Sequence, residues 1–467
     1  MKPSGDSVSR LLLERVWKGM ADWVEVMPVI AAVVIYDMQG HTITLDSMSE
    51  FSGTSISAGL FWERDQEFPA AEAEQVSTLS TSFPLGHILT KQGATGGELF
   101  GWSVAVSGAR VLVGAPCDDS VATDAGAAYL FDATTSILLQ TFQNPDPRAN
   151  DNFGLSVSAS LGNFLVGAPY DDTGASNAGI VYLFNIDNPA PSKVFQNPSP
   201  SNGDLFGRSL ATSGTRILVG APFDDANGTD AGQAYLFDAS TVELIRTFHS
   251  PSTSAGEYFG WSVAFAGEEV LVAAPGSDVG GPDAGVAYVF NSATGSLLYT
   301  LQKPAPVAGD YFGWSVAGLE DGFLVGAIGD DAGAVNSGTV YFYDTSGSLV
   351  RIFPNPTPGD MDQFGLSIAA LDGSMLVGAP YDDTVAPDGG TAYLVDITSG
   401  SVLQTFQGPS PATQDYFGWS VAAFGSTIVI GAPYEDRGAP DAGAVYVFVG
   451  TAGGSGGGGG GNRILLI

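Results

Sequence analysis

The sequence predicts an all-β protein, a seven-bladed β-propeller whose blades each contain four antiparallel strands. Three observations support this: a sevenfold repeat, four strand-like runs in each repeat, and complementary chain ends. A Phe-Gly pair recurs at intervals of 52 or 53 residues. A fixed period of this length is typical of repeat architectures whose units pack against their neighbours. The seven pairs begin at Phe100, Phe153, Phe206, Phe259, Phe312, Phe364 and Phe417.

Each repeat contains four runs rich in Val, Ile, Leu, Phe and Tyr, separated by Gly, Pro, Asp or Ser. In the first repeat these runs are 102–106, 111–115, 127–131 and 137–142. Such runs between turn residues predict β-strands. The connections are too short for crossover helices, so an antiparallel meander is expected. Seven meanders in a ring form a propeller, in which radial repetition protects the strand edges.

The chain ends predict how the ring closes. The seventh repeat has strand-like runs at 419–423, 428–431 and 445–449 and then continues into glycine, so its fourth strand is missing. An additional run at 86–91 precedes the first Phe-Gly pair. We therefore expect 87–91 to pair with 445–449, so that an N-terminal strand completes the last blade.

Three regions follow from this pattern: a non-repeat N-terminal extension at 1–84, the propeller at 85–449 and a Gly-rich tail at 450–467. In the extension, apolar residues at steps of three and four predict an amphipathic helix over 13–27. Strands are expected within 29–36 and 42–45. The apolar run 27–36 is too short to cross a bilayer, so no membrane span is expected. Its acidic and basic flank suits a signal peptide poorly.

Composition narrows the possible partners. The 467 residues include 50 acidic and 16 basic side chains, for a formal net charge of −34. Such a surface repels phosphate backbones, so nucleic-acid binding is not expected. Cations or basic partners suit this charge, although solubility alone could also explain it. The one cysteine, Cys117, cannot form an intrachain disulfide and is expected to serve as a small apolar residue.

The repeated motif resembles a known family. In the first repeat it reads Phe100-Gly101-Trp102-Ser103-Val104, then Leu112-Val113-Gly114-Ala115-Pro116, then Ala125-Gly126-Ala127-Ala128-Tyr129-Leu130-Phe131. This pattern resembles FG-GAP repeats, which build the seven-bladed head of integrin α subunits. The resemblance implies adhesion or ligand binding at the cell surface or outside the cell, with calcium in blade loops. The integrin-type calcium loop is absent here, because only a tight turn at 107–110 joins the first two strands. The repeats are closer to a short-loop variant of the family.

Acidic residues concentrate in two loops of each repeat, which a meander places on the same face. One acid lies two residues before each Phe, and an acidic pair follows most Gly-Ala-Pro strands. Two interpretations remain open: these side chains cap turns, or they bind calcium through oxygen ligands. The candidate calcium ligands are Asp118, Asp119, Asp124, Asp171, Asp172, Asp224, Asp225, Asp230, Asp382, Asp383 and Asp388.

The sequence therefore predicts a non-catalytic binding or adhesion propeller that contacts a protein or glycan through its acidic loop face. Equivalent blades would make this binding multivalent. A hydrolase of polysaccharide or lipid head groups with its site at the central channel is an alternative, and a structural scaffold is another. Catalysis has little support, because His41, His87 and His249 do not recur beside a nucleophile or a carboxylate. The aromatic residue after several Phe-Gly pairs could line the channel or pack in the core.

Overall fold

The computed structural model describes residues 34–36, 42–44, 82–160, 162–252 and 254–450. All regular elements in this part of the chain are β-strands. β1 (Val34–Tyr36) and β2 (Thr42–Thr44) form a two-stranded antiparallel sheet of their own, within the predicted strands of the extension. The predicted helix over 13–27 and the Gly-rich tail lie outside the described residues.

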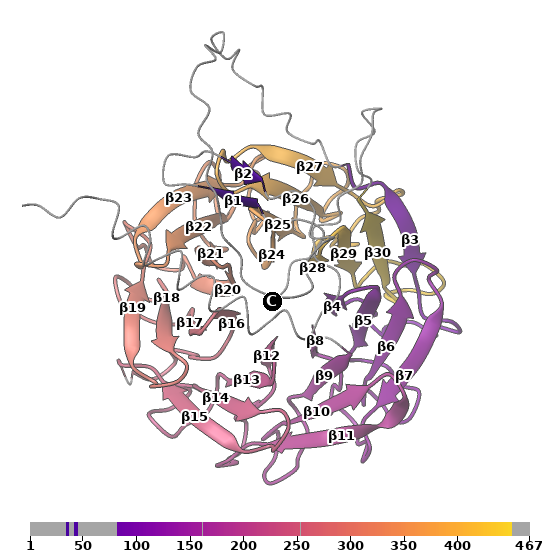
Figure 1. The fold of residues 1–467 in the computed structure, drawn as a ribbon. Coiled ribbons are helices and arrows are strands. Elements are labelled where there is room, and N and C mark those ends of the chain that lie inside the picture. The colour runs from indigo at the N-terminus through magenta and orange to yellow at the C-terminus, as the bar shows by residue number, and fades with distance from the viewer. Residues whose placement is uncertain (1–33, 37–41, 45–81, 161, 253, 451–467) are drawn as a thin grey trace, which may run out of the picture. The chain divides into compact units, whose positions relative to one another are not determined.

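The strands from Leu85 to Val449 form seven four-stranded antiparallel sheets arranged in a ring, so the predicted propeller is confirmed (Figure 1). We number the blades by their Phe-Gly pairs. They are blade 1, β4 (Ser103–Ser107), β5 (Arg110–Ala115), β6 (Ala127–Asp132), β7 (Leu138–Gln143); blade 2, β8 (Ser156–Ser160), β9 (Asn163–Ala168), β10 (Ile180–Asn185), β11 (Asn188–Gln196); blade 3, β12 (Ser209–Ser213), β13 (Arg216–Ala221), β14 (Gln233–Asp238), β15 (Leu244–His249); blade 4, β16 (Val263–Ala266), β17 (Glu269–Ala274), β18 (Val286–Asn291), β19 (Leu297–Leu301); blade 5, β20 (Phe312–Gly318), β21 (Gly322–Ala327), β22 (Thr339–Asp344), β23 (Leu349–Pro354); blade 6, β24 (Ser367–Leu371), β25 (Ser374–Ala379), β26 (Thr391–Asp396), β27 (Val402–Phe406); blade 7, β28 (Ser420–Phe424), β29 (Thr427–Ala432), β30 (Ala444–Val449), β3 (Leu85–Leu89).

The hydrophobic core lies between neighbouring blades. Phe153 is fully buried in a cluster that joins Leu112 and Leu130 of blade 1 to Val166 and Tyr182 of blade 2. The second and third strands of each blade are buried almost throughout, so their side chains are apolar on both faces. The Phe of each Phe-Gly pair therefore fills the space between two sheets.

Neighbouring blades are also joined by hydrogen bonds around the channel. Ser103 Oγ donates to the Gly154 carbonyl oxygen at 2.8 Å, and Ser420 Oγ donates to Gly101 O at 2.7 Å, which links blade 7 to blade 1. Gly154 has φ of +93°, and a Cβ there would lie 2.4 Å from Ala127 O. Only glycine fits this close backbone approach.

The run before the first Phe-Gly pair is the outer strand of blade 7. β3 pairs antiparallel with β30, with Ile88 opposite Tyr446 and Leu89 opposite Val445. The strand ends at Leu89, two residues before the predicted end at 91. Lys91 leaves the sheet because its ammonium group forms ion pairs with Glu98 and Asp118.

Candidate functional site

Acidic side chains occupy three repeated positions with different surroundings. The Phe-side acid lies two residues before each Phe. The strand-end acid is the first acid after the Gly-Ala-Pro strand, and the outer acid follows it directly. Both the Phe-side and the strand-end acids are buried, and in six blades they form a couple. The couples are Glu98 with Asp118, Asp151 with Asp171, Asp204 with Asp224, Asp310 with Asp330, Asp362 with Asp382, and Asp415 with Glu435.

Backbone and tyrosine donors hold these couples in place. In blade 3, Asp204 Oδ2 accepts the backbone N–H of Ser201 at 2.7 Å. Asp224 Oδ1 accepts the N–H of Ala226 at 2.9 Å, and its Oδ2 accepts the hydroxyl of Tyr235 at 2.6 Å. The repeat places this tyrosine on the third strand of the blade, so the strand-end acid ties its loop to the sheet.

A third position lies beside the two acids, and in blades 1, 2 and 5 its residue contacts both of them. The sequence analysis did not identify this position. It lies nine residues before each Phe, and we call this place the bridging position. In blade 1, Lys91 Nζ lies 3.2 Å from Glu98 Oε1 and 2.9 Å from Asp118 Oδ2. In blade 2, Asn144 Nδ2 donates to Asp151 at 2.8 Å and to Asp171 at 3.1 Å. The seven bridging residues are Lys91, Asn144, Asn197, Ser250, Lys303, Asn355 and Gly408.

The pKa of the Phe-side acid differs with the residue at the bridging position. Burial opposes the ionisation of Glu98, but hydrogen bonds from Thr95, Gly96 and Lys91 outweigh it and lower the pKa of this carboxyl. Where the bridging residue is Asn, burial and the charge of the strand-end acid raise the pKa of the Phe-side acid to about 6. This holds for Asp151, Asp204 and Asp362. An amide bridges two carboxylates without neutralising them.

The outer acids are exposed and cap the following turn. Asp119 Oδ1 accepts the N–H of Asp124 at 2.7 Å, and Asp172 Oδ1 accepts that of Asn177 at 2.9 Å. All seven blades make this bond, at 2.7 to 3.0 Å. The donor residues all have φ between 49° and 52°, a region in which Asp and Asn are enriched. These contacts are those of turn caps. Within the described residues, no three His, Cys, Asp or Glu side chains gather to hold a metal.

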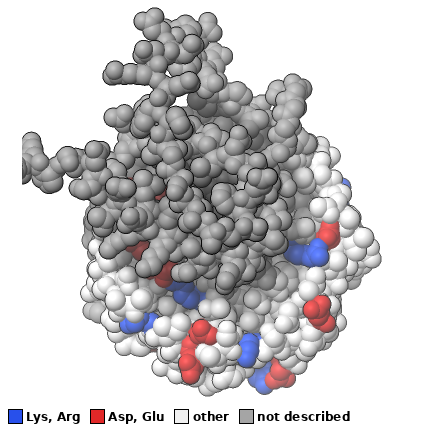
Figure 2. Space-filling view, in the orientation of Figure 1, with Lys and Arg blue, Asp and Glu red and all other residues white. Residues whose placement is uncertain are grey.

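The candidate calcium ligands therefore fall into two groups. Asp118, Asp171, Asp224 and Asp382 are buried strand-end acids. The others lie in the exposed or half-buried loop. Figure 2 shows the face turned toward the viewer in Figure 1. Where described residues are visible on it, acidic and basic side chains alternate along the rim. In this second group Asp119, Asp172, Asp225 and Asp383 are exposed, and Asp124, Asp230 and Asp388 are half-buried.

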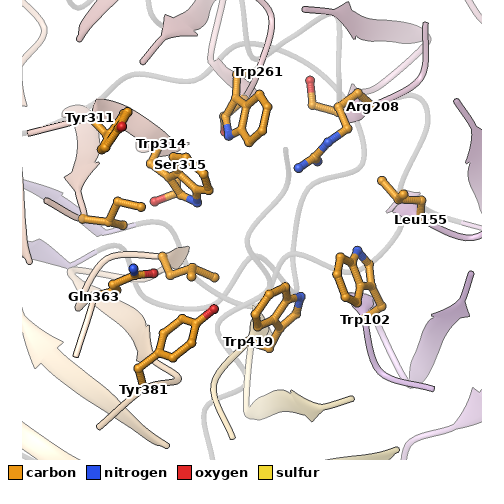
Figure 3. Close-up of a pocket in the computed structure, with 14 residues that line it drawn as sticks. Trp102, Leu155, Arg208, Trp261, Tyr311, Trp314, Ser315, Gln363, Tyr381 and Trp419 are labelled. Carbon is orange, nitrogen blue, oxygen red and sulfur yellow. The ribbon is translucent and has the colours of Figure 1, made fainter. Parts of the chain in front are cut away.

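A cavity of about 580 Å³ lies in the central channel, where the first strand of each blade begins (Figure 3). We call it the channel mouth. The residues directly after the Phe-Gly pairs form a ring around it, so the aromatic ones line the channel, which is one of the two alternatives that the sequence left open. This ring consists of Trp102, Leu155, Arg208, Trp261, Trp314, Leu366 and Trp419. Unlike the acidic loops, the ring differs from blade to blade.

Aromatic side chains form two groups on opposite sides of the channel mouth (Figure 3). The ring centroids of Trp102 and Trp419 lie 4.7 Å apart, and those of Trp261 and Trp314 lie 4.9 Å apart. Arg208 extends over Trp261, with its guanidinium carbon 4.5 Å from the ring centroid. No Asp, Glu or His is among the lining residues. The channel mouth thus offers flat apolar faces beside one cation.

Backbone strain surrounds the same cavity. The residue before each Phe-Gly pair has a positive φ between 50° and 57°, although none of these residues is glycine. They include bulky side chains such as Leu99, Tyr258 and Tyr311. Non-glycine residues pay about 1 kcal/mol or more for this conformation, which clusters at functional sites. The conformation recurs in all seven blades, so it belongs to the repeated turn before each Phe-Gly pair.

Cys117 and His87 are the candidates for a nucleophile and a base, and the contacts of both are structural rather than catalytic. Burial, followed by the charge of Asp124, raises the pKa of the Cys117 thiol to about 12, so it stays protonated at neutral pH. His87 Nε2 lies 2.7 Å from the carbonyl oxygen of Thr134. Neither residue lines the channel mouth.

The part of the chain that the structure describes contains no helix long and apolar enough to cross a bilayer.

Comparison with known proteins agrees with this architecture. Integrin alpha-2 from Bos taurus is 26% identical over 199 residues, and this match covers 38% of the chain but only 17% of integrin alpha-2. The FG-GAP repeat family matches more than half of the chain, in seven stretches, one per blade. These are residues 87–131, 140–184, 199–237, 247–290, 306–343, 358–395 and 409–448. With seven matched repeats folded as seven blades, the chain belongs to the FG-GAP repeat family.

Proposed function

We propose that this chain is a non-catalytic binding propeller of the adhesion type, which acts at a cell surface or outside the cell. The observation that carries the proposal is the channel mouth, where four tryptophans surround a cavity of about 580 Å³. Aromatic faces bind ligands that present flat apolar surfaces, and tryptophan and arginine are enriched among residues that dominate binding energy. The similarity to integrin alpha-2 supports this assignment.

The ligand class is a protein segment or a glycan. Sugar rings and the side chains of an extended peptide both have apolar faces edged by polar groups. The Trp261–Trp314 and Trp102–Trp419 pairs would stack on such faces, while Arg208 and Gln363 supply hydrogen bonds. Since the ring around the mouth differs from blade to blade, one ligand orientation is favoured over the others.

Calcium is a second element of the proposal. Each outer acid uses Oδ1 to accept one backbone N–H and is exposed to solvent, so its other oxygen is available to a hard cation. The formal net charge of −34 favours such counter-ions.

A binding screen tests the proposal. The purified full chain is applied to a panel of glycans and extracellular proteins, beside the double variant Trp261→Ala/Trp314→Ala. We expect a ligand whose affinity falls at least tenfold in the variant, because stacking residues typically contribute about 1–3 kcal/mol each. The matched control is Phe424→Ala, an exposed aromatic residue at the opposite end of blade 7. Robust hydrolysis of a panel compound, or binding that is equally reduced by Phe424→Ala, would contradict the proposal.

A further inference from the structure

Blade 4 contains a buried carboxylate without a partner. Glu257 is 1% exposed, and among the residues that the structure describes neither of its carboxylate oxygens has a hydrogen-bond partner. Each of the other six Phe-side acids accepts at least one backbone N–H from the preceding loop. An isolated buried carboxylate is strongly unfavourable, so this group calls for a compensating positive charge.

The residues around Glu257 differ from those of every other blade. Ser277 replaces the strand-end acid, and Ser250 occupies the bridging position. Both serines are buried, and the Ser277 hydroxyl also lacks a hydrogen-bond partner. The Tyr288 hydroxyl lies 3.5 Å from Ser250 Oγ. Tyr288 takes the place that Tyr235 holds in blade 3, where the tyrosine hydroxyl donates to the strand-end acid Asp224.

Blades 1 and 5 show what this part of the fold accommodates. In blade 1, Lys91 Nζ lies between the two acids of the couple. In blade 5, Lys303 Nζ lies 2.9 Å from Asp310 and 3.1 Å from Asp330. Both ammonium groups occupy a buried place lined by oxygen atoms. In blade 4 the equivalent Ser250 has a neutral hydroxyl and supplies no cation. The oxygen atoms of Glu257 and Ser277 remain in the equivalent positions.

We propose that blade 4 binds a monovalent metal cation of the sodium class between Glu257, Ser250, Ser277 and Tyr288. These four side chains offer at most five oxygen atoms, which are ligands of the type that hard cations prefer. One ionised carboxylate is balanced by one positive charge. A calcium ion would leave an excess positive charge in a buried site and would lack the six to eight ligands it requires.

The proposed cation would occupy the position that a lysine ammonium group holds in blades 1 and 5. A cation there would tie the loop before Phe259 to β17 (Glu269–Ala274) and β18, as Lys91 ties the equivalent elements of blade 1. The propeller would then depend on sodium in one blade only. This dependence is separate from calcium at the exposed outer acids, because it involves different residues and a different ion.

Thermal unfolding of the full chain tests the proposal. The melting temperature is measured at pH 7.5 in sodium chloride and in choline chloride at equal ionic strength, since choline is too large for the site. We expect a saturable increase of about 3 °C in sodium, because a ligand that binds only the native state stabilises it by mass action. The increase should disappear in Glu257→Gln, whose neutral amide has no need of a cation.

Two further variants complete the test. Ser250→Lys copies the bridging residue of blades 1 and 5 and should raise the melting temperature in choline while removing the sodium dependence. Glu98→Gln, in the lysine-bridged blade 1, should keep the sodium dependence. Equal melting temperatures of the unmodified chain in sodium and choline would overturn the proposal. So would a Glu257→Gln variant that is stabilised equally in both salts, because sodium would then give the buried carboxylate no compensation.

Discussion

The side chain at the bridging position distinguishes blades that are otherwise equivalent. Lys91, Asn144 and Ser250 occupy the same place in the fold, yet the first supplies a cation, the second an amide and the third only a hydroxyl. The pKa of Glu98, beside Lys91, is lowered, whereas the pKa of Asp151, beside Asn144, is raised to about 6. At this scale, the identity of one residue determines whether a carboxylate couple is balanced within the chain.

The amide-bridged couples predict a pH dependence of stability. The folded-state pKa of Asp151, Asp204 and Asp362 is about 6, above the ordinary value of 3.8. Their contribution to stability is therefore complete below pH 4 and is lost as the pH rises through 6. The triple variant with Asn at these positions should gain stability relative to the unmodified chain between pH 4.5 and 7.5, measured by urea unfolding. A constant difference across this range would show that these acids do not titrate there.

The glycine of the Phe-Gly pair gives a second test at the residue scale. Gly154→Ala should lower the free energy of unfolding by about 3 kcal/mol or more, because a Cβ would lie 2.4 Å from Ala127 O. The control is Gly108→Ala, with φ of +58° and no atom within 4 Å of the added Cβ. It should cost only about 1 kcal/mol, from backbone strain alone. Similar losses in urea unfolding would argue against close packing of the blades.

At the scale of strands and loops, the sequence predicts the pairing well and the acidic site less well. Apolar runs and turn residues locate the blade strands to within one or two residues, because the pairing of a meander is local. The division of the acids into buried couples and exposed caps could not be predicted, because neighbouring residues such as Asp118 and Asp119 point into different surroundings. The bridging position always lies nine residues before the Phe of the Phe-Gly pair, and this constant spacing is visible in the sequence. The position is hard to recognise because its residue is Lys, Asn, Ser or Gly, depending on the blade.

Calcium at the outer acids is a prediction at the scale of the loop. With sodium held constant, millimolar calcium chloride should raise the melting temperature above that in choline chloride of equal ionic strength. Asp172→Ala combined with Asp225→Ala should reduce this increase, because it removes two exposed carboxylates. The lysine-bridged Glu98→Gln variant is the control and should respond as the unmodified chain does. If calcium has no effect on the unmodified chain, the outer acids serve only as turn caps.

At the scale of the whole molecule, an N-terminal strand pairs with the last blade of the ring. We propose that the pairing of β3 with β30 closes the propeller, since it gives blade 7 its fourth strand. Leu89 occupies the place that Leu301 holds in blade 4, and both are buried. Leu89→Ala should therefore cost about 2–5 kcal/mol, as much as Leu301→Ala, because each leaves a cavity in an equivalent core. A much smaller loss for Leu89→Ala in chemical unfolding would show that β3 is not an integral part of the ring.

The central claim is that function resides at one asymmetric channel mouth rather than in seven equivalent loops. Isothermal titration calorimetry of the full chain with the ligand found in the binding screen tests this claim most directly. The account predicts one ligand per chain, and at least tenfold weaker binding by Trp261→Ala/Trp314→Ala with an unchanged melting temperature. Several equivalent sites per chain, with affinity unaffected by these substitutions, would contradict it and would assign binding to the repeated loops instead.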